Sequence, residues 1–339
     1  MGAPRGVHRH GAEALKSLTI AELSSGGLIT NYQCSSACRH CLYGSSPRWE
    51  KEYITRETAE ALFRTMRSLH IASIHIGGGE PFLNISALEE VLKTAHERGI
   101  TVEYVETNSS WFHDEESAAR TLSALKKHGL TTLLISISPF HNEFIPFRKV
   151  KGVIGACERA DVAVFPWMRE FYPNVSALDE SKPHRIEEYA AKFGRNYLRD
   201  IPSRYRITMR GRAVDTYKDV FAQHGLDEIL ESKPCSELAS TGHFHFDLFG
   251  NYIPGLCSGL AIHHDDLGET LDFREYPFIT MLYSEGIAAF LAYAKGEGFQ
   301  PADSYLSKCH LCQEIRKYLV NEKKSASKEF VPAGYYREI

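Results

Sequence analysis

The sequence has little of what marks a membrane, secreted or nucleic-acid-binding protein. No apolar run approaches the roughly 20 residues that span a bilayer, and the N-terminal segment has no apolar signal-peptide core. The formal net charge is only -4, with acidic and basic residues interspersed. That balance gives no reason to expect a nucleic acid or an anionic membrane as a partner. With no internal repeat and no low-complexity tract, the sequence predicts an ordinary cytoplasmic protein.

The composition, 43% hydrophobic and 24% charged over 339 residues, is that of a globular chain. This length suffices for one large domain with a smaller appendage. The pattern divides the chain into a loose leader over residues 1–18, a core domain over 19–225, a smaller cysteine-bearing domain over 226–320 and a tail over 321–339.

Apolar strand-like runs and amphipathic helical stretches alternate through the first half of the sequence. Expected strands cover residues 26–30, 73–76, 101–106, 133–137 and 162–165. A helix is expected between each pair of strands. The first three begin at Thr55, Ser86 and Glu115, and a fourth ends at Arg159. Strands that recur about every thirty residues with a helix between them predict βαβ units and a parallel α/β sheet. Because there are too few units for an eight-fold barrel, we expect a partial barrel, open on one side, with its site at the C-terminal strand ends.

The second half is more polar and less regular. A helix is expected over residues 185–192, a strand over 206–209 and a helix over 287–294. Between His243 and Tyr252 the residues alternate, with Phe244 and Phe246 on one face, and a glycine follows at Gly250. This alternation predicts a β-hairpin.

The eight cysteines fall into three groups. They could make four disulfides, yet a cytoplasmic chain of this size has a sufficient core, which favours metal or catalytic roles. Three lie together near the N-terminus and four in the last third. Cys157 stands alone in a helical stretch and is predicted to pack as a small hydrophobe.

Cys34, Cys38 and Cys41 have the spacing C-x3-C-x2-C in one short segment. A structural zinc ion usually closes its shell with four ligands, whereas three cysteines on a cubane iron–sulfur cluster leave one iron open. We therefore interpret this segment as the ligand set of a cluster whose open iron binds something other than protein.

A glycine-rich strand end follows, at Gly78, Gly79, Glu80 and Pro81. Consecutive glycines let the backbone approach a ligand closely, and Glu80 adds an acceptor beside it. Taken alone, the motif would also suit a tight turn between a strand and a helix. Its place after the next strand beyond the cysteine segment favours a ligand site.

The other four cysteines are Cys235, Cys257, Cys309 and Cys312. Four soft thiolates suit either tetrahedral zinc or a fully ligated 4Fe-4S cluster. Sequence chemistry leaves both alternatives open.

Together these motifs resemble those of the radical S-adenosylmethionine (radical SAM) superfamily. The three-cysteine segment with His40 resembles its signature, and the glycine-rich strand end resembles its GGE motif. Glu106, Thr107 and Asn108 look like the E-T-N ending of its third strand. A hairpin flanked by cysteines and followed by C-x2-C resembles the twitch extension, the shortened form of the SPASM domain. The interval from Gly250 to Cys257 is longer than the usual SPASM spacing.

The resemblance implies a partial (β/α)6 barrel with a small twitch-like domain, and three cofactors: a 4Fe-4S cluster that binds SAM, a second, auxiliary 4Fe-4S cluster, and SAM itself. The residues implied at the SAM site are Gly78, Gly79, Glu80 and Pro81 around its amino group, Thr107, Asn108 and Ser136 at its ribose and carboxylate, and Arg169 as a partner of the carboxylate. Each polar side chain among them also suits a loop hydrogen bond, and Arg169 also suits a solvated surface position.

The resemblance also implies the reaction, in which reductive cleavage of SAM gives a 5′-deoxyadenosyl radical that abstracts a hydrogen from a substrate. We expect a peptide or protein side chain as substrate, with a small molecule such as an amino sugar or nucleotide as the alternative. An electron donor such as flavodoxin or ferredoxin is implied as a partner. A non-catalytic binding protein stabilised by zinc or disulfides is the hypothesis from another class, and it leaves the open three-cysteine set unexplained.

Overall fold

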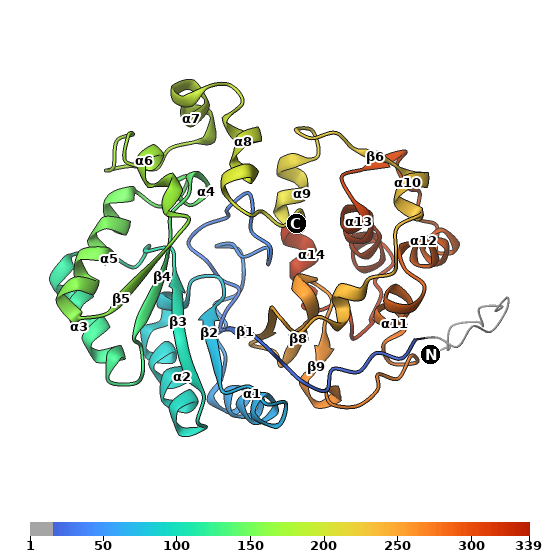
Figure 1. The fold of residues 1–339 in the computed structure, drawn as a ribbon, viewed down its shortest axis with the longest axis horizontal. Coiled ribbons are helices and arrows are strands. Elements are labelled where there is room, and N and C mark those ends of the chain that lie inside the picture. The colour runs from blue at the N-terminus through green and yellow to red at the C-terminus, as the bar shows by residue number, and fades with distance from the viewer. Residues whose placement is uncertain (1–15) are drawn as a thin grey trace.

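The computed structural model describes residues 16–339, so most of the expected leader, residues 1–15, lies outside the described residues. Leu18, the last residue of that leader, is 1% exposed. The strands are β1 Gly26–Ile29, β2 Ser73–Gly77, β3 Thr101–Thr107, β4 Thr132–Ser136, β5 Ala163–Trp167, β6 His224–Gly225, β7 Phe244–Asp247, β8 Asn251–Ile253, β9 Ile262–His263 and β10 Ser304–Tyr305 (Figure 1).

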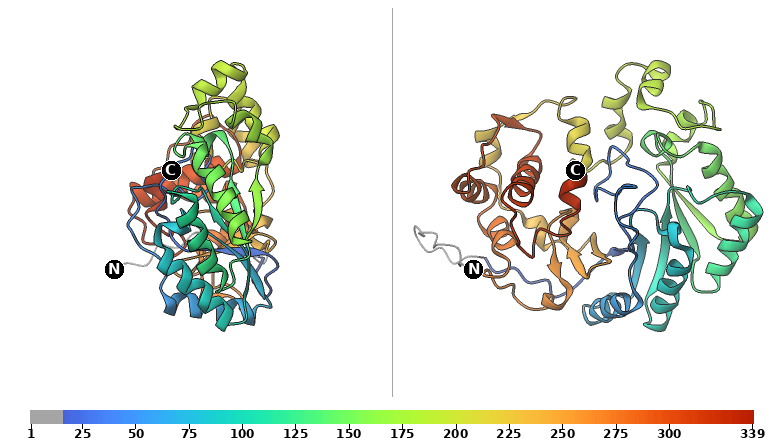
Figure 2. Two further views of the ribbon diagram at one scale, coloured as in Figure 1. Left: turned by 90° about the vertical axis from the view of Figure 1, so that its left-hand side faces the viewer. Right: turned by 180° about the vertical axis from the view of Figure 1, so that it is seen from behind.

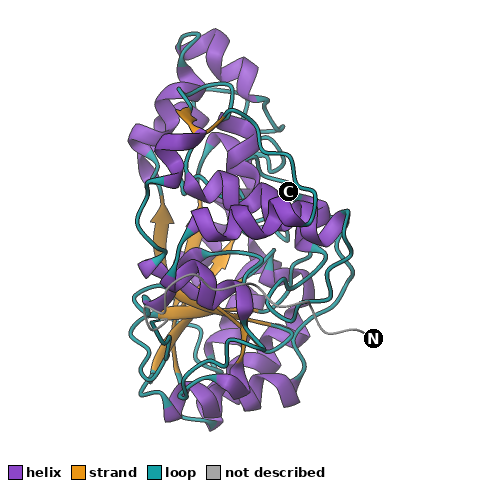
Figure 3. Ribbon diagram, turned by 90° about the vertical axis from the view of Figure 1, so that its right-hand side faces the viewer, coloured by secondary structure: helices purple, strands orange, loops and turns teal. Residues whose placement is uncertain are grey.

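The helices alternate with the strands in the first half and dominate the second half (Figures 1 and 3). They are α1 Arg56–Ser68, α2 Ile85–Glu97, α3 Glu115–Lys126, α4 Pro139–Asn142, α5 Phe147–Ala160, α6 Tyr172–Val175, α7 Ile186–Phe193, α8 Tyr197–Arg204, α9 Arg212–Tyr217, α10 Leu226–Leu230, α11 Pro277–Ser284, α12 Ile287–Gly296, α13 Lys308–Asn321 and α14 Tyr335–Glu338.

The main sheet has eight strands in the order β5-β4-β3-β2-β1-β7-β8-β9. Strands β1 to β5 are parallel to their neighbours, which confirms the predicted α/β architecture. Helices α1, α2, α3 and α5 lie on the outer side of these strands (Figure 1; Figure 2, left). The C-terminal ends of the parallel strands therefore meet at one edge, where the cysteine segment follows β1.

Local signals set the ends of the helices. Thr55 caps α1 by accepting a hydrogen bond from the backbone N–H of Thr58, as its position predicts. Helix α2 begins one residue before Ser86, and its cap is Asn84, which accepts from the backbone N–H of Ala87. The expected start at Ser86 was wrong because Asn84 offers an equally good cap two residues earlier.

The predicted strand over residues 206–209 does not form. This segment is irregular, and its residues Arg206, Ile207 and Thr208 line a cavity. The sheet extends at its other end, because β7 pairs in parallel with β1, from Gly26 with Phe244 to Ile29 with Asp247.

The predicted hairpin is confirmed as β7 and β8, which pair antiparallel through His245 with Ile253 and Phe246 with Tyr252. Gly250 turns the chain with a φ of +85°. Because β7 continues the sheet of β1, the expected domains over 19–225 and 226–320 share one sheet, and the boundary between them stays a prediction.

The expected tail over 321–339 packs against the rest of the chain. Tyr335 and Tyr336 in α14 are at most 1% exposed, and Arg48 pairs with Glu338 at 2.7 Å. In the described part of the chain, no helix combines the length and apolar character needed to cross a membrane.

Candidate active site

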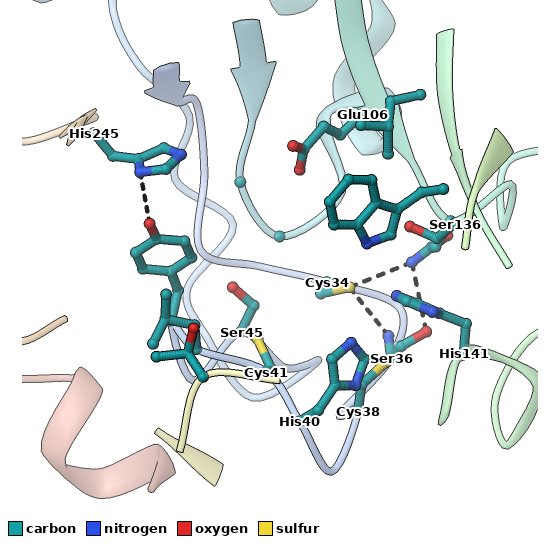
Figure 4. A pocket seen from close by; sticks show the side chains of 18 of the residues that line it. Cys34, Ser36, Cys38, His40, Cys41, Ser45, Glu106, Ser136, His141 and His245 are labelled. Atoms are coloured by element: carbon teal, nitrogen blue, oxygen red, sulfur yellow. Dashed lines mark hydrogen bonds between the residues drawn. The ribbon is translucent and has the colours of Figure 1, made fainter. Parts of the chain in front are cut away.

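The three N-terminal cysteines line one cavity of about 750 Å³ at the C-terminal ends of the parallel strands (Figure 4). Cys34 and Cys38 are each 7% exposed. Burial raises the pKa of Cys34 to about 12 and that of Cys38 well above its ordinary value. Without a metal these thiols are therefore neutral, and a bound metal centre would supply the positive charge that ionises them.

Gly78 and Gly79 line the same cavity, and the residues that precede Cys34 lie directly against them. The backbone N–H of Gly79 donates to the carbonyl of Asn31 at 2.7 Å. A Cβ atom at Gly79 would lie 1.9 Å from the carbonyl oxygen of Gln33, and one at Gly78, whose φ is +144°, 2.7 Å from that of Asn31. The glycines therefore let the segment with the cysteines lie against the strand end.

Glu80 does not face the cavity, although the motif implied that its carboxylate contacts SAM. The side chain is 0% exposed and accepts hydrogen bonds from Thr107 Oγ1 at 2.9 Å and from the backbone N–H groups of Asn108 and Phe82 at 2.7 and 3.2 Å. Burial still raises its pKa to about 7. Glu80 thus ties the end of β2 to the end of β3, and the cavity side of the motif consists of Gly78, Gly79 and Pro81.

Asn108 and Ser136 line the cavity. The Asn108 side-chain amide donates to Cys34 Sγ at 3.4 Å and to Ser35 Oγ at 3.1 Å. Thr107 also lines the cavity, but its hydroxyl donates to Glu80 and accepts from Trp111 Nε1 at 3.0 Å. Asn108 therefore contacts Cys34 directly, whereas the Thr107 hydroxyl already has hydrogen-bond partners within the protein.

Arg169 is not brought to this site. Met168 takes a left-handed φ of +64°, and the chain turns there into a short 3-10 helix, Arg169–Phe171. Arg169 is consequently exposed and is not part of the cavity wall.

The sequence indicated Glu106 only as part of the E-T-N ending and not as a site residue. In the structure its carboxylate faces the cavity (Figure 4). It lies over Gly77, where a Cβ atom would come within 2.8 Å of Glu106 Oε2. No described residue donates a hydrogen bond to it, and burial together with the charge of Glu80 raises its pKa to about 7. The signal was present in the sequence, because strand alternation puts Glu106 on the same face as Asn108.

A histidine pair connects β2 and β7, the two strands that flank β1, which the sequence did not indicate. His245 Nδ1 lies 2.7 Å from the Tyr43 hydroxyl, and His245 Nε2 lies 3.0 Å from His75 Nε2. Burial lowers the pKa of His75 to about 4 and that of His245 well below its ordinary value. Both rings are therefore neutral near pH 7.

The four downstream cysteines line a second, small cavity of about 30 Å³. The cations Arg210, Lys308 and Arg316 line it with them. Burial raises the pKa of Cys257 to about 12, with Arg210 acting in the opposite direction. The four thiols therefore have positive partners for the thiolate state that a metal centre requires.

Both cavities have polar atoms that fit a bound cofactor. Arg316 is 5% exposed, and its Nε atom has no hydrogen-bond partner among residues 16–339. At the larger cavity Ser45 Oγ, in a side chain 2% exposed, has none either. Such groups are rare in proteins unless a ligand or water pairs with them. The residues present therefore fit a sulfur-rich group at the second site and a polar ligand at the first.

No three sulfur atoms of either cysteine set lie within 4.8 Å of one another. Across residues 16–339, only His263, His264 and Asp265 bring three His, Cys, Asp or Glu ligand atoms within 4.8 Å of one another. Sulfur ligands on a single tetrahedral zinc ion lie roughly 3.8 Å apart, given a Zn–S bond of about 2.3 Å. Each cysteine set is thus wider than one zinc ion needs.

The model of the radical SAM superfamily matches residues 28–162. A relative, named Putative peptide biosynthesis protein YydG, from Bacillus subtilis (strain 168), is 27% identical over 128 residues, which are 36% of this chain and 38% of that protein. The match thus spans well under half of that relative.

Two similar solved structures match this chain at low identity. Streptococcus suis SuiB is 12% identical, with a TM-score of 0.34, over 87% of this chain and 75% of that one. Native anSMEcpe with bound AdoMet is 16% identical, with a TM-score of 0.43, over 87% of this chain and 97% of that one. The segment that the radical SAM model matches, residues 28–162, contains the three N-terminal cysteines and the glycine-rich strand end that line the larger cavity.

Proposed function

We propose that this protein is a radical SAM enzyme that abstracts a hydrogen atom from a peptide or protein side chain. When bound, a 4Fe-4S cluster and SAM supply the chemistry, namely one-electron reduction of the sulfonium to give methionine and a 5′-deoxyadenosyl radical. The observation that carries the proposal is that Cys34, Cys38 and Cys41 share one cavity with Gly78 and Gly79.

The chain's own residues position and shield the reactants. The three cysteines would hold the cluster, and Asn108 orients Cys34 through its side-chain amide. Backbone groups of Gly78 and Gly79 would receive the amino end of SAM. Glu106, rather than Glu80, is the carboxylate available to that ammonium group, because it faces the cavity beside Gly77 without a partner.

The cavity wall provides the environment that a carbon radical needs. Tyr104, Leu134, Trp167 and Tyr205 line it, and apolar and aromatic walls exclude water and stray donors. The Tyr205 hydroxyl is fixed by hydrogen bonds with Trp167 Nε1 and His40 Nε2, each at 3.0 Å. A fixed wall favours one orientation of the substrate carbon.

A peptide substrate is supported by the relative from Bacillus subtilis, whose name refers to peptide biosynthesis. We propose a second 4Fe-4S cluster on Cys235, Cys257, Cys309 and Cys312, supported by their shared cavity and by a spread wider than zinc needs. We also propose flavodoxin or ferredoxin as the electron donor, and a cytoplasmic location in which all eight cysteines stay free of disulfides.

The test is anaerobic reconstitution with iron and sulfide, followed by dithionite and SAM. Methionine and 5′-deoxyadenosine in equal amounts are expected from the wild-type chain. Incubation with peptides deuterated at their side chains should transfer deuterium into 5′-deoxyadenosine. Transfer from amino sugars or nucleotides alone would overturn the peptide substrate, and no cleavage of SAM by a chain loaded with both clusters would overturn the enzyme class.

A further inference from the structure

Three consecutive residues, Arg210, Gly211 and Arg212, run directly between the two cysteine sites. Arg210 Nε donates to Cys309 Sγ at 3.4 Å, in the downstream set. Arg212 Nε donates to the carbonyl of Cys38 at 2.9 Å, in the first set. The segment thus contacts both sites within three residues.

Arg210 is the only charged side chain that lines both described cavities. Its Nη1 donates to the carbonyl of Gly255 at 2.8 Å, and Nη2 lies 3.8 Å from Glu237 Oε1. The guanidinium is therefore fixed between the larger cavity and the sulfur of Cys309.

Gly211 keeps the segment in close contact with the first site. Its φ is +58°, and a Cβ atom there would lie 2.5 Å from the carbonyl oxygen of Cys41. Its backbone N–H donates to Gln313 Oε1 at 2.8 Å, one residue beyond Cys312 in α13. The side chain of Gln313 returns a hydrogen bond to the Gly211 carbonyl at 3.2 Å. The position of Arg210 is therefore set by contacts with both sites.

The two sites differ in the charges around them. Three cations, Arg210, Lys308 and Arg316, and one carboxylate, Glu237, line the downstream cavity. The first site has as many carboxylates as cations. Arg206 and Arg210 line its cavity and Arg212 acts on the thiols of Cys34 and Cys38. The carboxylate of Glu106 lines the same cavity, and those of Glu80 and Glu143 act on the thiols in the direction opposite to Arg212. Positive charge and N–H donors at cysteine sulfur stabilise the more negative, reduced form of an iron–sulfur cluster.

We propose that Arg210 is the residue that makes the downstream site the stronger electron acceptor, by donating its Nε–H to Cys309 while its charge lies between the two cavities. The inference rests on the proposed function, because it needs an iron–sulfur cluster at each site. Arg210 is a positioning residue, because it acts on the reduction potential through Cys309. The step itself is the uptake of one electron by the downstream cluster, in which no covalent bond forms or breaks.

The test is a redox titration of the reconstituted full-length chain, followed by the EPR signal of the reduced clusters. The Cys38→Ala variant leaves only the downstream cluster and assigns its signal. In the wild-type chain, we expect the downstream cluster to be reduced at a higher potential than the first. Arg210→Met should lower the potential of the downstream cluster by at least 59 mV, the equivalent of a tenfold change in the ratio of reduced to oxidised cluster.

Arg206→Met is the matched control, because Arg206 lines the larger cavity but donates to no cysteine in the described chain. It should leave the potential of the downstream cluster unchanged, while Arg210→Lys should give an intermediate value because it keeps the charge and loses the Nε–H. If Arg210→Met does not retain the second cluster, Arg210→Gln takes its place.

Several results would overturn the inference: an equal shift for Arg206 and Arg210 variants, an unchanged potential in both Arg210 variants, the reverse order of the two clusters, or zinc in the downstream set. Each of these is compatible with SAM cleavage by the first site. Loss of the proposed function would instead be seen as absence of 5′-deoxyadenosine.

Discussion

Glu80 and Glu106 lie at the ends of neighbouring strands, yet only the carboxylate of Glu106 faces the cavity. Glu80 accepts three hydrogen bonds from the protein, whereas no described residue donates to Glu106. The charge of Glu80 also raises the pKa of Glu106. A half-buried carboxylate without a partner is less stable in its charged form than one in water, so Glu106 is the group in this pair that is available to a ligand.

We expect the Glu106→Gln substitution to stabilise the metal-free chain above pH 7. The pKa of Glu106 rises from 4.5 to about 7 in the folded chain, so the folded chain holds a proton that the unfolded chain releases between those values. The free energy of unfolding therefore falls as the pH rises through this window, by roughly 3 kcal/mol. Glutamine has no such proton to lose.

Urea unfolding of both chains at several pH values measures this difference. The two chains should be equally stable near pH 4.5 and should diverge toward pH 7 and above. Glu103→Gln, at an exposed position of the same strand, should not reproduce the divergence. Parallel stability curves for wild type and Glu106→Gln would show that Glu106 is not held in a charge-excluding site.

In the reconstituted protein the same substitution should weaken the binding of SAM. Loss of a charge-assisted hydrogen bond to the ammonium group costs about 1.5–3 kcal/mol, or roughly tenfold to a hundredfold in the dissociation constant. Equilibrium dialysis with labelled SAM at pH 8 measures it, with Glu103→Gln as the control. Equal affinities for the wild-type and Glu106→Gln proteins would remove Glu106 from the SAM site.

Gly79→Ala should displace the cysteine segment. The added Cβ atom would lie 1.9 Å from the Gln33 carbonyl oxygen, and backbone on both sides cannot yield without moving the strand end. We expect a destabilisation of more than about 2 kcal/mol and loss of cluster binding. Gly225→Ala, where no atom lies within 4 Å of the added Cβ, should change the stability by less than about 0.5 kcal/mol. Similar unfolding midpoints for the two variants would contradict the close contact.

Iron analysis separates the cysteine groups. The wild-type chain should bind about eight irons and eight sulfides, and Cys312→Ser about four of each. Cys157→Ser should keep the wild-type content, because Cys157 is fully buried in α5 among apolar residues. Four irons and one zinc in the wild-type chain would show that the downstream set is a zinc site.

Local patterns in the sequence predicted the strands β1 to β5 and the helices between them, because their apolar periodicity lies within short windows. They also predicted the hairpin and the grouping of the cysteines. The pairing of β7 with β1 was not predictable in this way, because it joins segments more than 200 residues apart. The expected strand over residues 206–209 does not form. Arg206, Ile207 and Thr208 line the cavity instead of pairing with another strand, and this position also depends on tertiary packing.

At the site, the sequence motifs indicated which backbone segments lie near the cavity, but not the direction in which every side chain points. The motif implied a ligand contact for Glu80, whose carboxylate turns instead to the end of β3. Arg169 followed the expected strand, but the left-handed turn at Met168 leaves it exposed. Contacts such as Arg210 with Cys309 depend on tertiary packing across 99 positions of sequence and have no local signal.

The most direct test of the account compares SAM cleavage by Cys38→Ser and Cys157→Ser with that by the wild-type chain, after anaerobic reconstitution and reduction with dithionite. Both variants lose one buried cysteine, but only Cys38 lines the cavity with Gly78 and Gly79. We predict that wild type and Cys157→Ser form 5′-deoxyadenosine and methionine, and that Cys38→Ser forms neither. Equal 5′-deoxyadenosine from Cys38→Ser and wild type, or none from a wild-type chain that holds its clusters, would contradict the account.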